Sequence, residues 1–135
     1  MGTRTRMGCA LVGHEHQRLT EGLRGWLLAS FDGVFMVADA ASLTEGARKL
    51  QPELLVLDLS LAAGRLGALL HELRQAAPRS RVLVLSDYED ARVDALILAD
   101  GADGVVHKTE LAQDLSAAVD AVLAGRRFGI PKPRP

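Results

Sequence analysis

The chain has 135 residues, of which 48% are hydrophobic and 24% charged, enough apolar material for one folded domain and too much for a disordered segment. No apolar run reaches the roughly 18 residues that span a bilayer, and no apolar stretch follows the charged N-terminus as in a secretory signal. The single cysteine, Cys9, excludes an internal disulfide, so we expect a cytoplasmic protein with no membrane partner.

The net charge of −1 conceals an acidic centre between two basic ends. All 17 acidic residues lie between Glu15 and Asp120, whereas six of the 16 basic residues lie in the terminal segments. The centre therefore has ten basic against 17 acidic residues, a balance of −7. Because such a body repels a phosphate backbone, we expect the folded part to bind no nucleic acid.

Five short apolar runs predict β-strands, at residues 9–12, 34–38, 54–57, 82–85 and 104–106. Three of them are continuous rather than alternating, which is typical of parallel strands covered on both faces. Amphipathic stretches between the runs predict helices, with one shared apolar face formed by Leu19, Leu23, Trp26 and Leu27 and another by Leu111, Leu115, Ala118, Val119 and Val122. This alternation predicts an α/β fold, an open, doubly wound, five-stranded parallel sheet with five helices.

Local signals predict where some helices begin and end. Ser42, with Glu45 three residues later, has the capping-box pattern and is expected to open the second helix. Pro78 should end the third helix, expected over residues 66–77, and Thr109 is placed to cap the last helix. Residues 1–7 are expected to form a tail, 8–124 the domain, and 125–135 a basic, proline-rich tail or the start of a linker.

The candidate site lies where the strands end, because open parallel sheets bind ligands beyond the carboxyl ends of their strands. A buried carboxylate such as Asp58 needs a charged partner or a metal, and Lys108 after the last strand can reach across as a point charge. An acid, a hydroxyl and a lysine at one edge are a more specific combination than any of them alone. The residues at these ends are Gly13, His14, Glu15, Asp58, Ser86, His107 and Lys108.

A family resemblance is carried by five segments, VGHEHQRLTEGL, LLVLDLSL, VLVLS, GADGVVHK and AVLAGRRF. Over residues 8–128 the chain resembles the CheY-like, flavodoxin-like receiver domains of two-component response regulators, of the kind that precede the helix-turn-helix of NarL/LuxR-type transcription regulators. The resemblance implies that Asp58 accepts a phosphoryl group from a histidine kinase and that Ser86 and Lys108 bind the phosphoryl oxygens. It also implies Mg²⁺ held by Glu15, Asp58 and the backbone carbonyl of Ser60.

The resemblance extends to the output. It implies that the domain switches its output through the fourth and fifth helices. The same two helices would form the interface of a possible homodimer. We expect any DNA binding to belong to a C-terminal domain that is missing from this sequence.

Four positions depart from the family pattern. His14 precedes Glu15 where the family has two acids, so it removes a negative charge and is doubtful as a metal ligand. Asp87 follows the serine where a small residue is usual, and it either faces the phosphoryl site or points to solvent. Val105 stands where an aromatic residue often swings inward, and Ala62 replaces a proline. Together they favour weakened or altered phosphorylation.

Three interpretations follow. The first is a phosphoryl-accepting receiver, and the alternative is a phosphorylation-independent pseudo-receiver that acts as a dimerisation or protein-interaction module. An enzyme is not expected, because an aspartate-nucleophile phosphatase would have a second acid where Ser60 stands. No Gly-rich phosphate loop follows the first strand, which also disfavours a flavodoxin-like cofactor carrier. We assign no role to His71 or His107.

Overall fold

A computed structural model describes residues 7–14 and 17–129 of the chain. In this part five parallel strands form one sheet, comprising β1 (Met7–Gly13), β2 (Phe31–Val37), β3 (Leu54–Asp58), β4 (Arg81–Ser86) and β5 (Gly104–His107). Their order is β2-β1-β3-β4-β5, so the direction of winding reverses between β1 and β3. A crevice at the carboxyl ends of neighbouring strands is expected at such a switch point.

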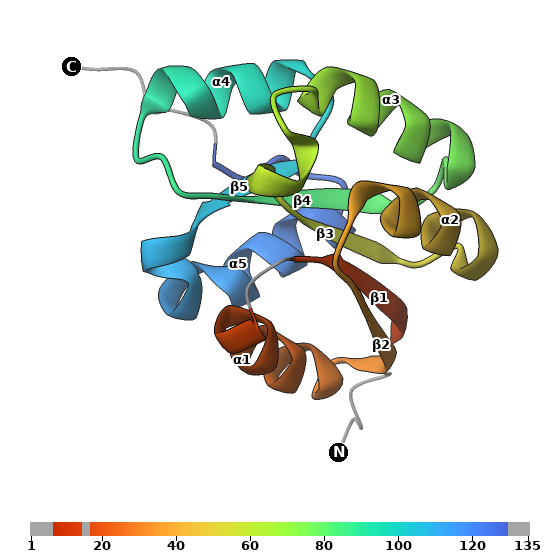
Figure 1. Ribbon diagram of the computed structural model, residues 1–135. Helices are drawn as coiled ribbons and strands as arrows, with labels where there is room; N and C mark the ends of the chain where they lie inside the picture. The colour runs from red at the N-terminus through yellow and green to blue at the C-terminus, as the bar shows by residue number, and fades with distance from the viewer. Residues whose placement is uncertain (1–6, 15–16, 130–135) are drawn as a thin grey trace.

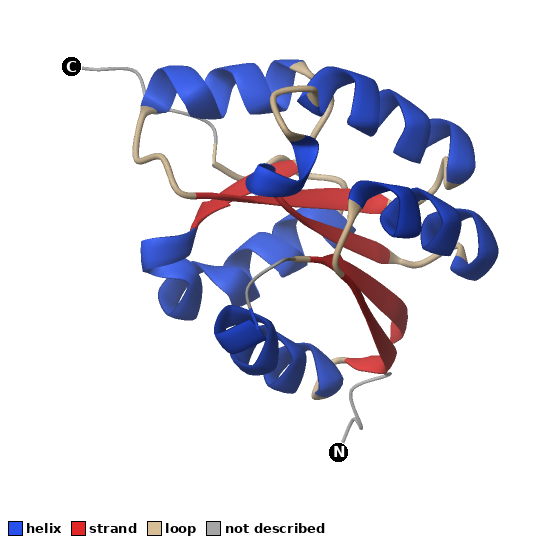
Figure 2. Cartoon of the chain, in the orientation of Figure 1, coloured by secondary structure: helices blue, strands red, loops and turns tan. Residues whose placement is uncertain are grey.

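Helices cover both faces of the sheet (Figure 1). On one face lie α1 (Gln17–Leu28) and α5 (Leu111–Leu123), and on the other lie α2 (Ala40–Leu50), α3 (Leu66–Ala76) and α4 (Ala91–Ala99). Two 3-10 turns, η1 (Leu59–Ala62) and η2 (Lys108–Glu110), directly follow β3 and β5. Figure 2 shows the strands as a middle layer between helices, which confirms the predicted doubly wound architecture.

Two apolar cores lie on the two faces of the sheet, and alternation along each strand supplies both. In β3, Leu55 and Leu57 pack in the core under α2, α3 and α4, whereas Leu54 and Val56 pack in the core under α1 and α5. All five residues of β3 are buried. A strand that is covered on both faces has no solvent-facing positions, which explains the continuous apolar run in the sequence.

Most strands extend beyond the apolar runs that predicted them. Asp58 pairs with Leu85, and Ser86 pairs with His107, so these polar residues belong to the ladder. The apolar run that predicts a strand stops at its last apolar residue. Backbone pairing can continue beyond it, because every peptide unit carries a hydrogen-bond donor and an acceptor. The pairing of the strands therefore places Asp58 and Ser86 at the carboxyl edge of the sheet in a fixed register.

Two predicted helix caps are wrong. Asp39 rather than Ser42 caps α2, because the helix begins three residues earlier and the Asp39 carboxylate accepts the Ser42 N–H at 2.7 Å. Thr109 does not cap α5, because η2 comes first and the Thr109 hydroxyl donates to the Glu89 carboxylate. The predicted end of the third helix is one residue late, since α3 ends at Ala76.

After α5 the chain returns to the outer edge of β5. The Val105 N–H donates to the Phe128 carbonyl at 3.1 Å, and the Phe128 N–H donates to the Asp103 carbonyl at 3.1 Å. Phe128 also packs against the core under α1 and α5. Residues 126–129 thus continue the folded domain beyond its last helix.

None of the helices in the described ranges is long and apolar enough to cross a membrane.

Candidate functional site

Asp58 is the centre of the candidate site. It is the last residue of β3 and its side chain is fully buried. The chain turns into η1 directly after it, and Oδ1 of Asp58 accepts the Ser60 N–H at 3.0 Å. The strand and the turn therefore fix the carboxylate at the switch point of the sheet.

Lys108 reaches the same carboxylate from β5. Its Nζ lies 2.8 Å from Oδ2 of Asp58 and 3.2 Å from Oδ2 of Asp87. The Lys108 side chain is 12% exposed, whereas that of Asp87 is 63% exposed. The orientation of Asp87, which the sequence left open, is thus toward Lys108 on the solvent side of the site.

His14 is the third group on Asp58. It follows β1, and its Nε2 lies 3.0 Å from Oδ2 of Asp58 with both side chains fully buried. The backbone N–H of His14 donates to the Val37 carbonyl at 3.0 Å. The ring Nε2 and Oδ2 of Asp58 are close enough to interact electrostatically, but their geometry is not that of a hydrogen bond.

The surroundings keep the Asp58 carboxylate ionised. Burial by itself would raise its pKa, but Lys108, the Ser60 N–H and His14 together lower the pKa below the usual range. Burial likewise acts to lower the pKa of Lys108, but Asp58 and then Asp87 raise it above its usual value. The two residues therefore form a charged pair at neutral pH.

Ser86 lies at the same edge of the sheet, on the strand next to that of Asp58. It ends β4, it is fully buried, and its hydroxyl accepts the Tyr88 N–H at 3.0 Å. Among the described residues, Asp58 and Ser86 share no hydrogen bond. The structure thus brings Asp58 and Lys108 together and places Ser86 on the intervening strand.

Mg²⁺ takes near-octahedral oxygen ligands. Of the two oxygens of Asp58, Oδ1 accepts the Ser60 N–H, whereas Oδ2 is buried near the nitrogens of His14 and Lys108 and accepts no hydrogen bond from the described residues. Within residues 7–14 and 17–129, no three His, Cys, Asp or Glu side chains could hold a metal together. Glu15, expected to be a ligand with Asp58 and the Ser60 carbonyl, lies outside the described residues.

A second, partly buried ion pair joins β5 to α4. His107 Nε2 lies 2.9 Å from Oδ2 of Asp94, a buried carboxylate on α4. We assigned no role to His107 from the sequence. The available signal was Asp94 itself, an acid within the apolar run of its helix. The pair links α4 to β5, the strand that directly precedes Lys108.

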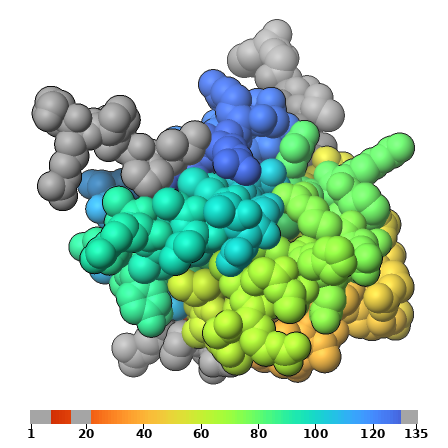
Figure 3. Space-filling view, turned by 90° about the horizontal axis from the view of Figure 1, so that it is seen from above, coloured from red at the N-terminus to blue at the C-terminus, as the bar shows by residue number. Residues whose placement is uncertain are grey.

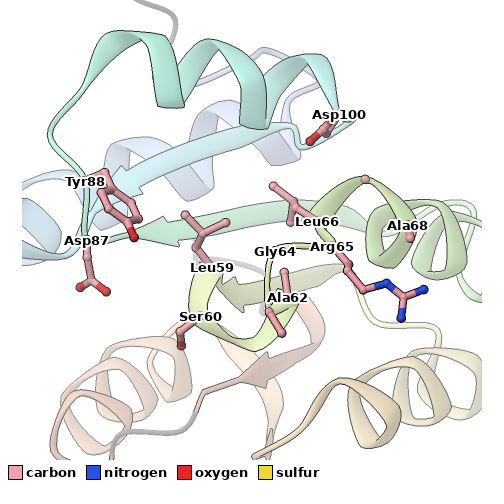
Figure 4. A pocket seen from close by; sticks show the side chains of 12 residues that line it. Leu59, Ser60, Ala62, Gly64, Arg65, Leu66, Ala68, Asp87, Tyr88 and Asp100 are labelled. Atoms are coloured by element: carbon pink, nitrogen blue, oxygen red, sulfur yellow. The ribbon is translucent and has the colours of Figure 1, made fainter.

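An open hollow of about 670 Å³ lies beside the site (Figure 4). Leu59, Ser60 and Arg65 line it from η1 and the start of α3, and Asp87 and Tyr88 line it from the segment after β4. Figure 3 looks down on α3 and α4, which form this side of the molecule. The loops that carry Ser60 and Asp87 therefore both line this open hollow.

A smaller groove of about 470 Å³ runs between α1 and α5. It is lined by Trp26, Leu23 and Leu115 and reaches Lys108 and Thr109 at one end. Trp26 is half-buried and packs against the core, although the sequence predicted it to be a core residue.

Comparisons with known proteins agree with this geometry. No family model matches the chain. The oxygen regulatory protein NreC of Staphylococcus carnosus is 30% identical over 105 residues, a match that covers 75% of this chain and 48% of that protein. NreC of Staphylococcus haemolyticus is 29% identical over 97 residues, covering 69% of this chain and 45% of that protein. The chain thus spans about half the length of the curated relatives it matches.

Solved structures share the fold over nearly the whole chain. A LuxR-family two-component response regulator from Aurantimonas sp. SI85-9A1 superposes with a TM-score of 0.80 at 26% identity, covering 92% of this chain and 89% of that one. The isolated REC domain of RcsB from Salmonella enterica serovar Typhimurium gives a TM-score of 0.79 at 23% identity, covering 93% of each chain. The receiver domain of NarL from Mycobacterium tuberculosis gives 0.78 at 22% identity, covering 90% and 100%.

The sheet order and these likenesses identify the chain as a receiver domain of the two-component response regulators, with the CheY-like fold. Within that class its structural neighbours are of the LuxR family. The resemblance that the sequence indicated is thereby confirmed.

Proposed function

We propose that Asp58 accepts a phosphoryl group from a histidine kinase and that the domain signals this through α4 and α5. The observation that carries the proposal is the buried contact of 2.8 Å between Lys108 Nζ and Asp58 Oδ2. Phosphoryl transfer depends chiefly on positioning and charge neutralisation. An ionised carboxylate held by a fixed cation at the switch point meets both requirements.

The proposed transfer uses the Asp58 carboxylate as nucleophile. One carboxylate oxygen attacks phosphorus, and the P–N bond of the kinase phosphohistidine breaks. Its electron pair stays on the imidazole, which then takes a proton, and Asp58 becomes an acyl phosphate. Lys108 then donates charge-assisted hydrogen bonds to the phosphoryl oxygens. Because Asp58 is fully buried, one of the groups that cover it has to shift when the donor approaches.

The proposed switch runs from Ser86 to α4. If the Ser86 hydroxyl turns to a phosphoryl oxygen, it releases the Tyr88 N–H and frees the segment that leads into α4. Val105 is buried and has no ring to swing, so the change relies on this segment. Tyr88 and Leu96, which are 58% and 65% exposed, give this side of the domain an apolar surface for a partner such as a second copy.

A second candidate is a phosphorylation-independent pseudo-receiver that acts as an interaction or dimerisation module. The observation in its favour is that Asp58 is fully buried with both carboxylate oxygens engaged, Oδ1 by Ser60 and Oδ2 by His14 and Lys108. In this case the assembly state would not respond to a phosphodonor.

We infer the wider setting from the same class. Receiver domains of response regulators are in general not enzymes, and we expect no independent catalytic activity here. The acidic balance of the central segment favours DNA binding, if any, by another part of a longer protein. We propose a cytoplasmic location, where histidine kinases present their phosphoryl groups.

Intact-mass measurement after incubation with acetyl phosphate tests the proposal. The unchanged chain should gain one phosphoryl group and Asp58→Asn should gain none. Asp32→Asn, at the opposite end of the sheet in β2, is a matched control that should behave like the unchanged chain. If folded protein gains no phosphoryl group with or without Mg²⁺, and its assembly state ignores the donor, the pseudo-receiver takes the place of the proposal.

A further inference from the structure

We propose that Asp87 binds Lys108 in the unphosphorylated domain at the place that a phosphoryl oxygen would take, so that phosphorylation of Asp58 has to displace Asp87. The inference rests on the proposed function, because it concerns what the same site releases when it accepts a phosphoryl group. Its basis is the pair of carboxylates that share the Lys108 ammonium group.

Lys108 contacts two carboxylates of different character. Its Nζ lies 2.8 Å from Oδ2 of the fully buried Asp58, and it donates a hydrogen bond to Oδ2 of Asp87 at 3.2 Å. The Asp87 side chain is 63% exposed and lines the open hollow beside the site (Figure 4). Asp87 therefore lies on the solvent side of Lys108, whereas Asp58 lies on the inner side.

Charge makes Asp87 a competitor of the phosphoryl group for Lys108. A phosphoryl group brings up to two negative charges and three acceptor oxygens, and a neighbouring carboxylate opposes it. One of the groups bound to the ammonium then has to leave. Asp87 can turn into water and stay hydrated, whereas the charge of the buried Asp58 has no such alternative. The exposed Asp87 is therefore the partner that leaves.

The same displacement reaches the segment that leads into α4. Asp87 directly follows β4, and the next residue, Tyr88, donates its N–H to the Ser86 hydroxyl at 3.0 Å. Ser86 and Lys108, the two residues proposed to bind phosphoryl oxygens, are thus both bound to this segment in the unphosphorylated domain. A phosphoryl group that takes both of them frees the segment from both contacts at once, and the start of α4 can then move.

The other two acids of the segment have different partners. Glu89 accepts the hydroxyl of Thr109, and Asp90 caps α4 by accepting the Arg92 N–H at 2.8 Å. Glu89→Gln is therefore a matched control for Asp87→Asn. It removes one carboxylate from the same segment, and its amide oxygen can still accept the Thr109 hydroxyl.

The test measures the phosphorylation rate of the unchanged chain, Asp87→Asn and Glu89→Gln at a series of acetyl phosphate concentrations in MgCl₂. An Asp58 oxygen attacks phosphorus and the P–O bond to the acetyl group breaks, with its electron pair leaving on acetate. Asp87→Asn should reach half its maximal rate at about fivefold lower donor concentration, the effect of a surface ion pair at the upper end of the usual range. The maximal rate should change little, because Asp87 competes only with binding.

The control variant should show the donor dependence of the unchanged chain. Where the rate does not saturate, its slope against the acetyl phosphate concentration should rise about fivefold in Asp87→Asn and stay constant in Glu89→Gln.

A second measurement needs no phosphorylation. Hydrogen exchange of a peptide that covers residues 87–93 reports how often the segment and the start of α4 open. Asp87→Asn should exchange several-fold faster there than the unchanged chain, because a neutral amide binds an ammonium more weakly than a carboxylate does. Exchange in α2 should be equal in all three proteins, which shows that the fold is retained.

The outcomes separate the inference from the proposed function. Equal donor dependence in Asp87→Asn and the unchanged chain, an equal gain in Glu89→Gln, or unchanged exchange of the segment overturns the inference and leaves the proposed function standing. Phosphorylation of Asp87→Asn but not of the unchanged chain would support both. Absence of phosphorylation in every folded variant overturns the proposed function, and the inference with it.

Discussion

Lys108 and Asp58 meet across an intervening strand. Lys108 follows β5 and Asp58 ends β3, so the 2.8 Å contact spans the carboxyl end of β4, where Ser86 lies. The two side chains are 12% and 0% exposed. Solvent and salt therefore screen this pair much less than a surface pair.

We predict that Asp58 makes the fold sensitive to acid. Its pKa is lowered in the folded state, so its contribution is complete above the ordinary carboxyl pKa of about 4 and is lost as the pH falls through the folded value. Below about pH 4 the free energy of unfolding should therefore fall more steeply for the unchanged chain than for Asp58→Asn. The total extra loss should be about 1.4 kcal/mol for each unit by which folding lowers the Asp58 pKa. Urea denaturation at a series of pH values measures this. Parallel pH profiles would contradict the prediction.

We predict a large coupling between Lys108 and Asp58. Lys108→Met leaves a buried carboxylate without its cation and should cost about 3 kcal/mol of unfolding free energy. In an Asp58→Asn background the same change should cost less than about 1 kcal/mol, because the buried charge is gone. Lys49→Met is the matched control, because Lys49 is 72% exposed and its Nζ lies 3.7 Å from Oε1 of Glu45, a weak surface ion pair. This change should lower the unfolding free energy by at most about 0.5 kcal/mol. Equal costs in both backgrounds would show that the pair is not coupled.

We predict that Arg74 holds the end of α3 to the loops before β4 and β5. Its guanidinium donates to the Ser80 carbonyl at 2.9 Å, the Gly101 carbonyl at 2.7 Å and the Asp103 carboxylate at 2.9 Å. Arg74→Ala should lower the unfolding free energy by about 2 kcal/mol, because it leaves partly buried acceptors unsatisfied. Arg74→Lys should restore little, since an ammonium lacks the planar fork.

Arg48 provides the control for this prediction. Its pair with Glu45 lies on the surface, with side chains 59% and 51% exposed, so Arg48→Ala should change stability by at most about 0.5 kcal/mol. Similar losses for the two alanine variants in guanidinium denaturation would count against a special role for Arg74.

We predict that two glycines respond to alanine in opposite directions. A Cβ on Gly104 would lie 2.9 Å from Val122 and 3.0 Å from Leu83, so Gly104→Ala should destabilise by about 1–3 kcal/mol through overpacking. A Cβ on Gly25, in α1, would meet nothing within 4 Å, so Gly25→Ala should stabilise by about 0.5–1 kcal/mol through helix propensity. Thermal unfolding of the two variants gives the signs, and a stable Gly104→Ala would disprove the packing argument.

The strand pattern was predictable because strands buried on both faces consist of consecutive apolar residues. The continuous run LLVL identified β3 as a strand covered on both faces, as the structure confirms. The polar residues at the strand ends were predicted as site residues but lay outside the predicted strand bounds, because their pairing uses the backbone and is not visible in side-chain hydropathy. The prediction of Ser42 as the cap of α2 failed for a related reason, since Asp39 is also a good cap residue and only the folded chain fixes where the helix begins.

The site was predictable in part. Asp58 and Lys108 were placed at one edge because parallel strands end together, and their contact follows from that placement. The contact between His14 and Asp58 was not predicted, because it depends on β1 and β3 being neighbours and on a side-chain direction that spacing does not encode. The proposed roles of Ser86 and Glu15 stay predictions.

The return of the chain to β5 has a consequence for contacts between molecules. An outer strand with free N–H and C=O groups is a template for strands of other chains. On β5 the Val105 N–H is already taken by the Phe128 carbonyl, and Phe128 forms a parallel bridge with Gly104. An incoming strand would have to displace the chain's own segment there. The margin formed by β2, where Phe35 is 45% exposed, is therefore the side from which intermolecular sheet growth and aggregation would begin.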